Sequence, residues 1–256
     1  MLTIIGFNRH NKEVEYEIIK KIQGVSLRKS ELDLGCENLT SGKLCKIIQW
    51  IENAGKLELI QELTIESNQI EFLPNSIVKL KNLKSLNVNH NECRLLPTNF
   101  EKLTELDSFY ANGNKISELP EGMFEWPHVT HLYLQSNLIS SISDNIEKLS
   151  SLNYLNLSSN QLTVIPRAVS RLSELRELHL YANLICRLPD NFGELKLLYF
   201  LNLSCNKLNE VPESMGEMRG LENLDLKYND LESLPSTFEN LKSLVKIYFD
   251  EEKVRQ

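Results

Sequence analysis

The chain has 256 residues, of which 41% are hydrophobic and 25% are charged, proportions close to those of an average globular protein. This composition excludes a disordered chain, a collagen and a disulfide mini-protein, and no apolar run approaches the ~18 residues of a membrane-spanning helix. Lys and Arg total 28 against 35 Asp and Glu, giving a net charge of −7 without a basic block. We therefore expect neither nucleic acid nor a membrane as the partner.

The N-terminal residues MLTIIGFNRHNKE turn polar after a short apolar stretch and lack the basic start and longer apolar region of a signal peptide. The five cysteines, an odd number, form no CxxC pair, which argues against a disulfide framework and a zinc module. These features predict a cytoplasmic protein with free thiols, and we expect it to be a monomer.

Two helical patterns occur in the first 56 residues. The first is EVEYEIIKKI at 13–22, and the second, SGKLCKIIQWIENAG at 41–55, has Ser41 as a plausible N-cap and Gly55 as a C-cap. Between them, ELDLGCENL at 31–39 is a degenerate copy of the repeat that follows, with Glu37 where that repeat has asparagine. We interpret residues 1–56 as an N-terminal cap with a degenerate first repeat and an amphipathic helix.

From Leu63 onward the same pattern starts every 23 residues without an insertion. The starts are Leu63, Leu86, Phe109, Leu132, Leu155, Leu178, Leu201, Leu224 and, for a last partial copy, Ile247. Asparagine recurs at 68, 91, 114, 137, 160, 183, 206 and 229, and proline at 74, 97, 120, 166, 189, 212 and 235, with Ser143 in the remaining place.

Each part of the repeat has a physical interpretation. The LxL step has strand periodicity, and identical short strands stacked side by side form a parallel sheet whose leucines share one core. The asparagine amide can satisfy backbone groups where the chain leaves the strand, so that stacked asparagines form a ladder. Proline cannot continue a central strand, and the following PxxIxxLxxL spacing suggests short helical turns.

These residues resemble the 23-residue class of the leucine-rich repeat family, with its consensus LxxLxLxxNxLxxLPxxIxxLxx. The resemblance implies an α/β fold: a curved horseshoe solenoid with a parallel β-sheet on the concave face, short helical turns on the convex face and a helical N-terminal cap. It places eight full units and a partial C-terminal unit in residues 57–256. Similar repeats occur in cytosolic scaffolds of the Ras-suppressor and Scribble kind, and in bacterial proteins that include translocated effectors.

The C-terminal end has two interpretations. The charged residues from Asp250 to Arg255 could form a polar lid on the core. Alternatively, further repeats or an effector domain follow in a longer chain.

No motif for catalysis, a cofactor or a metal is evident. The sequence contains no GxxxxGK[ST], HExxH or GxSxG and no glycine-rich phosphate loop. His128 and His131 form a lone HxxH without a third ligand, and Cys205 lacks a base in a matching register. We therefore predict a non-enzymatic protein that needs no cofactor and no metal.

The strand positions that flank the LxL leucines point outward, and over the middle repeats they are almost free of charge. Aromatic enrichment with adaptable polar residues and depleted charge is typical of interface cores and paratopes. A solvated sheet would also favour such residues. We predict partner-binding residues on the concave face: Tyr110, Asn112, Tyr133, Gln135, Tyr154, Asn156, His179, Tyr181 and Phe200.

The predicted function is a protein–protein interaction module that binds a protein partner on this concave face. Two alternatives stay open: a bacterial effector delivered into a host cell by a route that needs no signal peptide, and the recognition part of a larger enzyme whose catalytic domain lies elsewhere. A structural spacer without a partner is a third hypothesis. The step from a solenoid fold to binding is an analogy; only the aromatic patch is specific to this chain.

Overall fold

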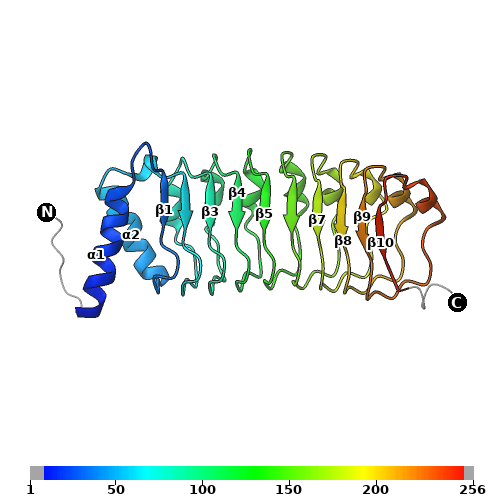
Figure 1. Ribbon diagram of the computed structural model, residues 1–256, viewed down its shortest axis with the longest axis horizontal. Helices are drawn as coiled ribbons and strands as arrows, with labels where there is room; N and C mark the ends of the chain where they lie inside the picture. Colours follow the sequence, from blue (N-terminus) through cyan, green and yellow to red (C-terminus); the bar gives the residue numbers. More distant parts are fainter. Residues whose placement is uncertain (1–8, 251–256) are drawn as a thin grey trace.

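The computed structural model describes the backbone of residues 9–250 and the side chains of residues 15–250. In this part of the chain, ten three-residue strands form one parallel sheet in which each strand pairs with the next along the sequence. Figure 1 shows the strands side by side along the long axis, with the short helices packed behind them. The expected solenoid with a parallel sheet on its concave face is confirmed.

The strand register follows the sequence repeat. From β2 onward each residue pairs with the residue 23 positions further along, as in Leu63 with Leu86. Leu32 pairs with Leu63 because the longer first connection contains a helix. The strands are β1 Glu31–Asp33, β2 Glu62–Thr64, β3 Ser85–Asn87, β4 Ser108–Tyr110, β5 His131–Tyr133, β6 Tyr154–Asn156, β7 Glu177–His179, β8 Phe200–Asn202, β9 Asn223–Asp225 and β10 Lys246–Tyr248.

Short 3-10 helices form the convex side, as the spacing after each proline predicts. Pro166 precedes one of them in an extended conformation, and in the unit without proline Ser143 caps the helix by accepting the N–H of Asn145. The convex helices are η1 Leu57–Leu59, η2 Asn75–Lys79, η3 Phe100–Lys102, η4 Glu121–Glu125, η5 Asp144–Lys148, η6 Arg167–Arg171, η7 Phe192–Glu194, η8 Glu213–Glu217 and η9 Ser236–Asn240.

One continuous hydrophobic core runs through the stacked units. The inward strand leucines are buried, for example Leu157 with 1% of its surface exposed. Phe100, Phe109 and Trp126 pack edge to face with ring centroids 4.9 to 5.7 Å apart, and the Trp126 indole N–H donates to the carbonyl of Phe100. No unit could bury these side chains alone, so each depends on its neighbours.

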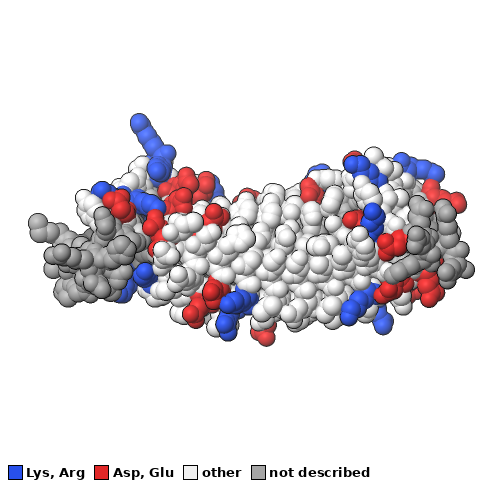
Figure 2. Space-filling model, turned by 60° about the horizontal axis from the view of Figure 1, so that its bottom comes forward, with Lys and Arg blue, Asp and Glu red and all other residues white. Residues whose placement is uncertain are grey.

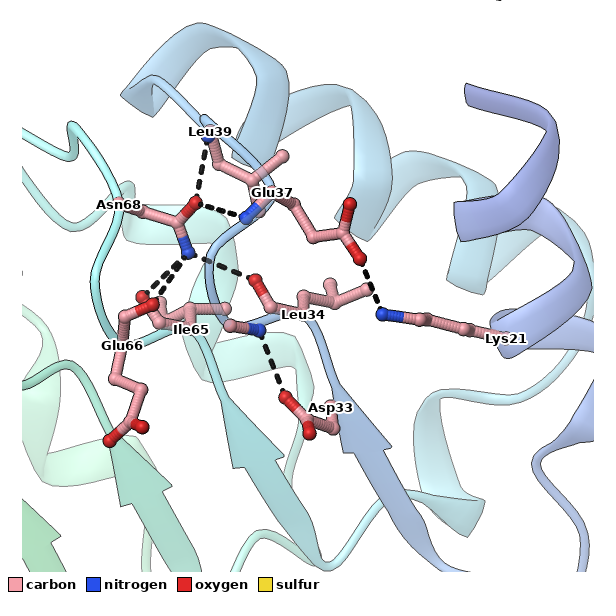
Figure 3. Close-up of polar contacts among 9 residues, drawn as sticks. Lys21, Asp33, Leu34, Glu37, Leu39, Ile65, Glu66 and Asn68 are labelled. Atoms are coloured by element: carbon pink, nitrogen blue, oxygen red, sulfur yellow. Dashed lines mark hydrogen bonds and ion pairs between the residues drawn. The ribbon is translucent and has the colours of Figure 1, made fainter. Parts of the chain in front are cut away.

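The asparagine ladder is confirmed. The Asn91 side chain accepts the N–H of Ile70 in the preceding unit at 3.0 Å and donates to the carbonyls of Ile65 and Val88. The ladder begins at Asn68, whose oxygen accepts two N–H groups of the 37–39 turn, as Figure 3 shows. Glu37 in the degenerate unit does not join the ladder and instead pairs with Lys21.

The residue before each ladder position adopts the left-handed backbone region. The φ angles lie between 53° and 64°, although only Gly113 is a glycine and the others carry a Cβ that disfavours this conformation. The turn recurs in every unit because the chain must leave the strand at the same angle to stack. The residues are Cys36, Ser67, His90, Gly113, Ser136, Ser159, Ala182, Cys205 and Tyr228.

Two helices lie at the N-terminal end, α1 Arg9–Gly24 and α2 Ser41–Asn53. The prediction of Ser41 as N-cap is wrong, because Thr40 caps α2 and Ser41 is its first residue. The Ser41 hydroxyl instead accepts two N–H groups from residues 71 and 72 of the adjacent unit. The C-cap is Ala54, one position earlier than the predicted Gly55, which follows it with a φ of 66°. Of the polar lid expected at residues 250–255, Asp250 accepts the N–H of Tyr228, and residues 251–255 lie outside the described residues.

Candidate binding surface on the concave face

The outward strand positions form aligned columns because the units are in strict register. Tyr110 pairs with Tyr133, and Tyr133 with Asn156, in the central column, while His131 pairs with Tyr154 in the column beside it. Residues two apart on a strand point to the same face, so the two columns present adjacent side chains to the concave surface.

Five rings from these columns form one stack, which we call the aromatic ladder. Its members are Tyr110, Tyr133, Tyr154, His179 and Phe200, with successive ring centroids 4.7, 4.5, 5.0 and 4.7 Å apart. The interplanar angles are 13° to 39°, so the ring faces turn toward one another. The ladder crosses β4 to β8 and therefore spans roughly 19 Å at the usual strand spacing.

The ladder is neutral around pH 7. Burial raises the pKa of the Tyr133 and Tyr154 phenols, so both keep their protons and can donate hydrogen bonds. Burial also lowers the pKa of His179, and this effect outweighs the hydrogen bond to Glu177 that favours the charged ring. The surface therefore offers aromatic edges, hydroxyl donors and an uncharged imidazole.

Glu177, the first residue of β7, contacts both the ladder residue His179 and Tyr199, which directly precedes β8. One carboxylate oxygen lies 3.2 Å from His179 Nε2, and the other accepts a hydrogen bond from the Tyr199 hydroxyl. That hydrogen bond is the main reason why the pKa of Tyr199 is raised. The predicted patch does not include Glu177 and Tyr199, since Tyr199 precedes its strand and its contact with Glu177 depends on side-chain geometry.

His131 also borders the ladder. Its ring centroid lies 6.3 Å from that of Tyr133 and 6.0 Å from that of Tyr154, and its Nδ1 lies 2.7 Å from Thr130 Oγ1. The column register, visible in the sequence, could have placed His131 in the predicted patch. Between residues 9 and 250, no group of three His, Cys, Asp or Glu side chains is arranged to hold a metal ion.

The predicted polar residues lie beside the ladder and are bonded within the sheet. Asn112 accepts the N–H of Gln135 at 2.8 Å, and Asn156 accepts the N–H of Ser158 at 3.0 Å. Tyr181 occupies the third outward position of its unit with 43% of its surface exposed. It is not one of the stacked rings. Contact of all nine predicted residues with a partner stays a prediction.

The five cysteines are all unpaired. Cys93 is buried in the core, and burial raises the pKa of its thiol to about 11. Cys36, which follows β1, Cys45, which lies on α2, and Cys186 are exposed. This arrangement has the features of packing and surface thiols rather than of an activated nucleophile.

Charged side chains are sparse at the outward strand positions of the middle units, from β3 to β6. Figure 2 shows a face on which Lys, Arg, Asp and Glu gather toward the two ends and along the borders, leaving a broad uncharged region between them. The arrangement suits noncovalent contact with another molecule. In the described part of the chain, no helix is long and apolar enough to cross a bilayer.

Comparison with known proteins agrees with this architecture. The family model described as Leucine rich repeat matches residues 58–116, 127–185 and 189–253. A search among curated proteins finds no significant match.

Many solved structures are similar to the chain. A leucine-rich repeat protein of Leptospira interrogans is 28% identical with a TM-score of 0.80, and the match covers 88% of this chain and 55% of that one. The ectodomain of the Arabidopsis thaliana receptor kinase GASSHO1/SCHENGEN3, solved with CASPARIAN STRIP INTEGRITY FACTOR 2, is 29% identical with a TM-score of 0.70 and coverages of 88% and 27%. TLR13, solved with ssRNA13, is 25% identical with a TM-score of 0.72 and coverages of 87% and 32%. The chain thus spans about half of the Leptospira protein and a third or less of the other two.

Proposed function

The chain belongs to the leucine-rich repeat family, and from this premise we propose that it is a non-enzymatic interaction module that binds a protein partner on its concave face. Repeats of this fold generally mediate contacts with proteins or peptides. The contact centre that we propose is the aromatic ladder, with His131 and the exposed Tyr181 at its borders.

The single observation that carries the proposal is the stacking of the ladder. Rings held by their neighbours lose little side-chain freedom when a partner binds, which lowers the entropic cost of association. Tyrosine combines a large apolar area with a hydroxyl, and aromatic anchors at the centre of an interface usually carry most of the binding energy. A structural spacer would not need five stacked rings on its solvent-facing side.

Two further proposals concern the class and setting of the protein. The 23-residue spacing supports the class that includes scaffolds of the Ras-suppressor and Scribble kind. The effector role remains the alternative, supported by the similarity to a bacterial leucine-rich repeat protein. Because the chain spans only part of its solved relatives, a role as the recognition part of a larger enzyme is the third candidate.

Substitution of the ladder tyrosines tests the proposal. We expect Tyr133→Ala and Tyr154→Ala each to weaken binding of the partner captured by the wild-type protein by at least ~1 kcal/mol, about fivefold in affinity. Tyr181→Ala tests whether the exposed side chain at the border of the aromatic ladder also contributes to the affinity. Tyr133 and Tyr154 each contact two neighbouring rings, and an aromatic pair contributes about 0.5–1.5 kcal/mol, so each substitution should lower the free energy of unfolding by about 1–3 kcal/mol without preventing folding. Tyr181→Ala removes no ladder contact and should change it by less than ~0.5 kcal/mol.

The controls are substitutions on the convex side. Lys148→Ala and Glu194→Ala should leave the affinity unchanged, as measured by titration calorimetry with melting curves beside it. If these variants abolish binding while the double Tyr133→Ala/Tyr154→Ala variant binds normally, the concave-face proposal is wrong.

We also propose a cytoplasmic location and a monomeric state. Free thiols are compatible with a reducing compartment. Cell fractionation and light scattering at several concentrations test the two statements separately.

A further inference from the structure

We propose that the partner lays an extended cationic segment across the concave face, with Lys or Arg side chains over β1 and β2, again beside Glu177 on β7, and uncharged residues along the ladder between them. This inference rests on the proposed function and specifies the chemistry of the partner.

The first observation is the sign of the charges on the concave face. Each unit presents three outward positions: the first and third residues of the strand and the residue two places further on. From β1 to β8 these positions hold no Lys or Arg. They hold five carboxylates: Glu31, Asp33, Glu62, Glu66 and Glu177.

The second observation is how ion pairs are distributed over the molecule. In the described chain, seven acidic side chains outside the concave face pair with Lys or Arg, and none of the five concave carboxylates does. The pairs are Lys20–Glu17, Lys21–Glu37, Lys79–Glu52, Lys115–Glu92, Lys148–Glu125, Arg171–Glu147 and Lys196–Glu217. On the concave face, Glu177 pairs with His179, whose lowered pKa keeps the ring neutral around pH 7.

The third observation is an unfavourable pairing within the sheet. Glu31 and Glu62 are directly opposite each other on β1 and β2, and both are exposed. Like charges in this position destabilise a sheet. Asp33 and Glu66 belong to the same two units and both border Gly35, where an added Cβ would lie 3.3 Å from Asp33 Oδ1 and 3.5 Å from Glu66 Cγ. Asp33 accepts the N–H of Gly35, and Glu66 accepts the amide of Asn87; both donors are neutral.

Four carboxylates on neighbouring strands thus have no Lys or Arg ion-pair partner, and a cationic segment laid across them would supply the missing counter-charge. The same field repels a polyanion, so charge complementarity favours a basic peptide over a nucleic acid. The ladder next to this acidic end supplies the neutral contact area.

The geometry sets the spacing of the cations. Five strand intervals separate β2 from β7, about 24 Å at ~4.8 Å per strand. An extended peptide covers this length with roughly seven residues at ~3.4 Å each. The second cation would approach Glu177, whose side chain is 30% exposed and already holds the Tyr199 hydroxyl. We therefore expect basic residues about seven positions apart with uncharged, partly aromatic residues between them.

A displayed library of random twelve-residue peptides is a suitable probe. After selection on the wild-type protein, we expect enrichment of peptides with Lys or Arg at that spacing, confirmed by fluorescence anisotropy of the synthetic peptides. We expect affinity to fall with added salt, because exposed charges are screened. Enrichment of neutral or acidic peptides, or no enrichment, would overturn the inference.

The matched variants change two charges each. Glu62→Gln/Glu66→Gln should weaken the selected peptides at least tenfold and flatten the salt dependence. Glu105→Gln/Glu174→Gln removes the same charge from exposed turns before β4 and β7 and should have no effect. Melting curves should show no loss of stability in the first variant, because it removes like-charge repulsion.

The outcomes separate this inference from the function on which it rests. If peptides or the natural partner lose affinity with Tyr133→Ala/Tyr154→Ala but not with Glu62→Gln/Glu66→Gln, the concave face binds a partner and the cationic segment is refuted. If the tyrosine variant has no effect on the natural partner, the proposed function fails.

Discussion

Replacing Asn160 with alanine should destabilise the solenoid more than its small size suggests. The amide oxygen accepts the N–H of Ile139 at 3.0 Å, and its nitrogen donates to the carbonyls of Leu134, Leu157 and Ser158 at 2.9, 3.0 and 3.2 Å. All four backbone partners are buried, and the side chain joins two units.

The magnitude follows from the groups left without partners. A buried donor or acceptor that loses its hydrogen bond costs ~1–3 kcal/mol. The Ile139 N–H should incur this cost in full, because its hydrogen bond is the one to Asn160. With partial loss at the three carbonyls, we expect Asn160→Ala to lower the free energy of unfolding by about 3–5 kcal/mol.

Urea denaturation followed by circular dichroism measures this loss. Asn160→Asp is a second variant that keeps the acceptor but places a carboxylate against three carbonyls, and it should destabilise at least as much. Asn153→Ala, which removes a half-buried amide directly before β6, should cost less than ~1 kcal/mol. If Asn160→Ala costs no more than this control, the ladder does not stabilise the fold and the reasoning fails.

Three other outcomes follow from the packing. Leu157→Ala should cost ~2–5 kcal/mol in the same assay, and an unchanged midpoint would refute the core register. Gly193→Ala should destabilise by more than ~2 kcal/mol, because the added Cβ would lie 1.8 Å from the carbonyl oxygen of Ser214; normal stability would disprove this contact. At pH 8, iodoacetamide should modify exposed Cys186 in the native protein, whereas Cys93, with its thiol pKa raised to about 11 by burial, should react only after unfolding; mass spectrometry distinguishes the two.

Most of the architecture could be predicted from the sequence, because equivalent residues in each unit form the same strand, core and turn. Leu63 and its equivalents specify both the strand and the core, and Asn68 and its equivalents specify where the chain turns. The 23-residue interval then determines which residues pair across strands. The columns of the concave face, including Tyr110, Tyr133 and Tyr154, follow directly from that interval.

Local features that break the repeat were harder to predict. Ser41 has the sequence signature of an N-cap, but its hydroxyl accepts two backbone N–H groups of the next unit, against which α2 packs. The left-handed backbone at Ser159 and Tyr228 has no glycine to indicate it. The conformation instead accompanies the stacking of the units and the hydrogen bonds of the following asparagine, which reach carbonyls in its own unit and in the preceding one.

The sequence by itself determined the solenoid, its register and the aromatic character of the concave face, since each depends on residue type at a fixed period. Only the tertiary structure decided that five rings stack while Tyr181 stays apart, and that Glu177 joins His179 to Tyr199. It also decided which carboxylates find a Lys or Arg partner and which do not. These features depend on side-chain rotamers and on distances between units, which a one-dimensional pattern does not contain.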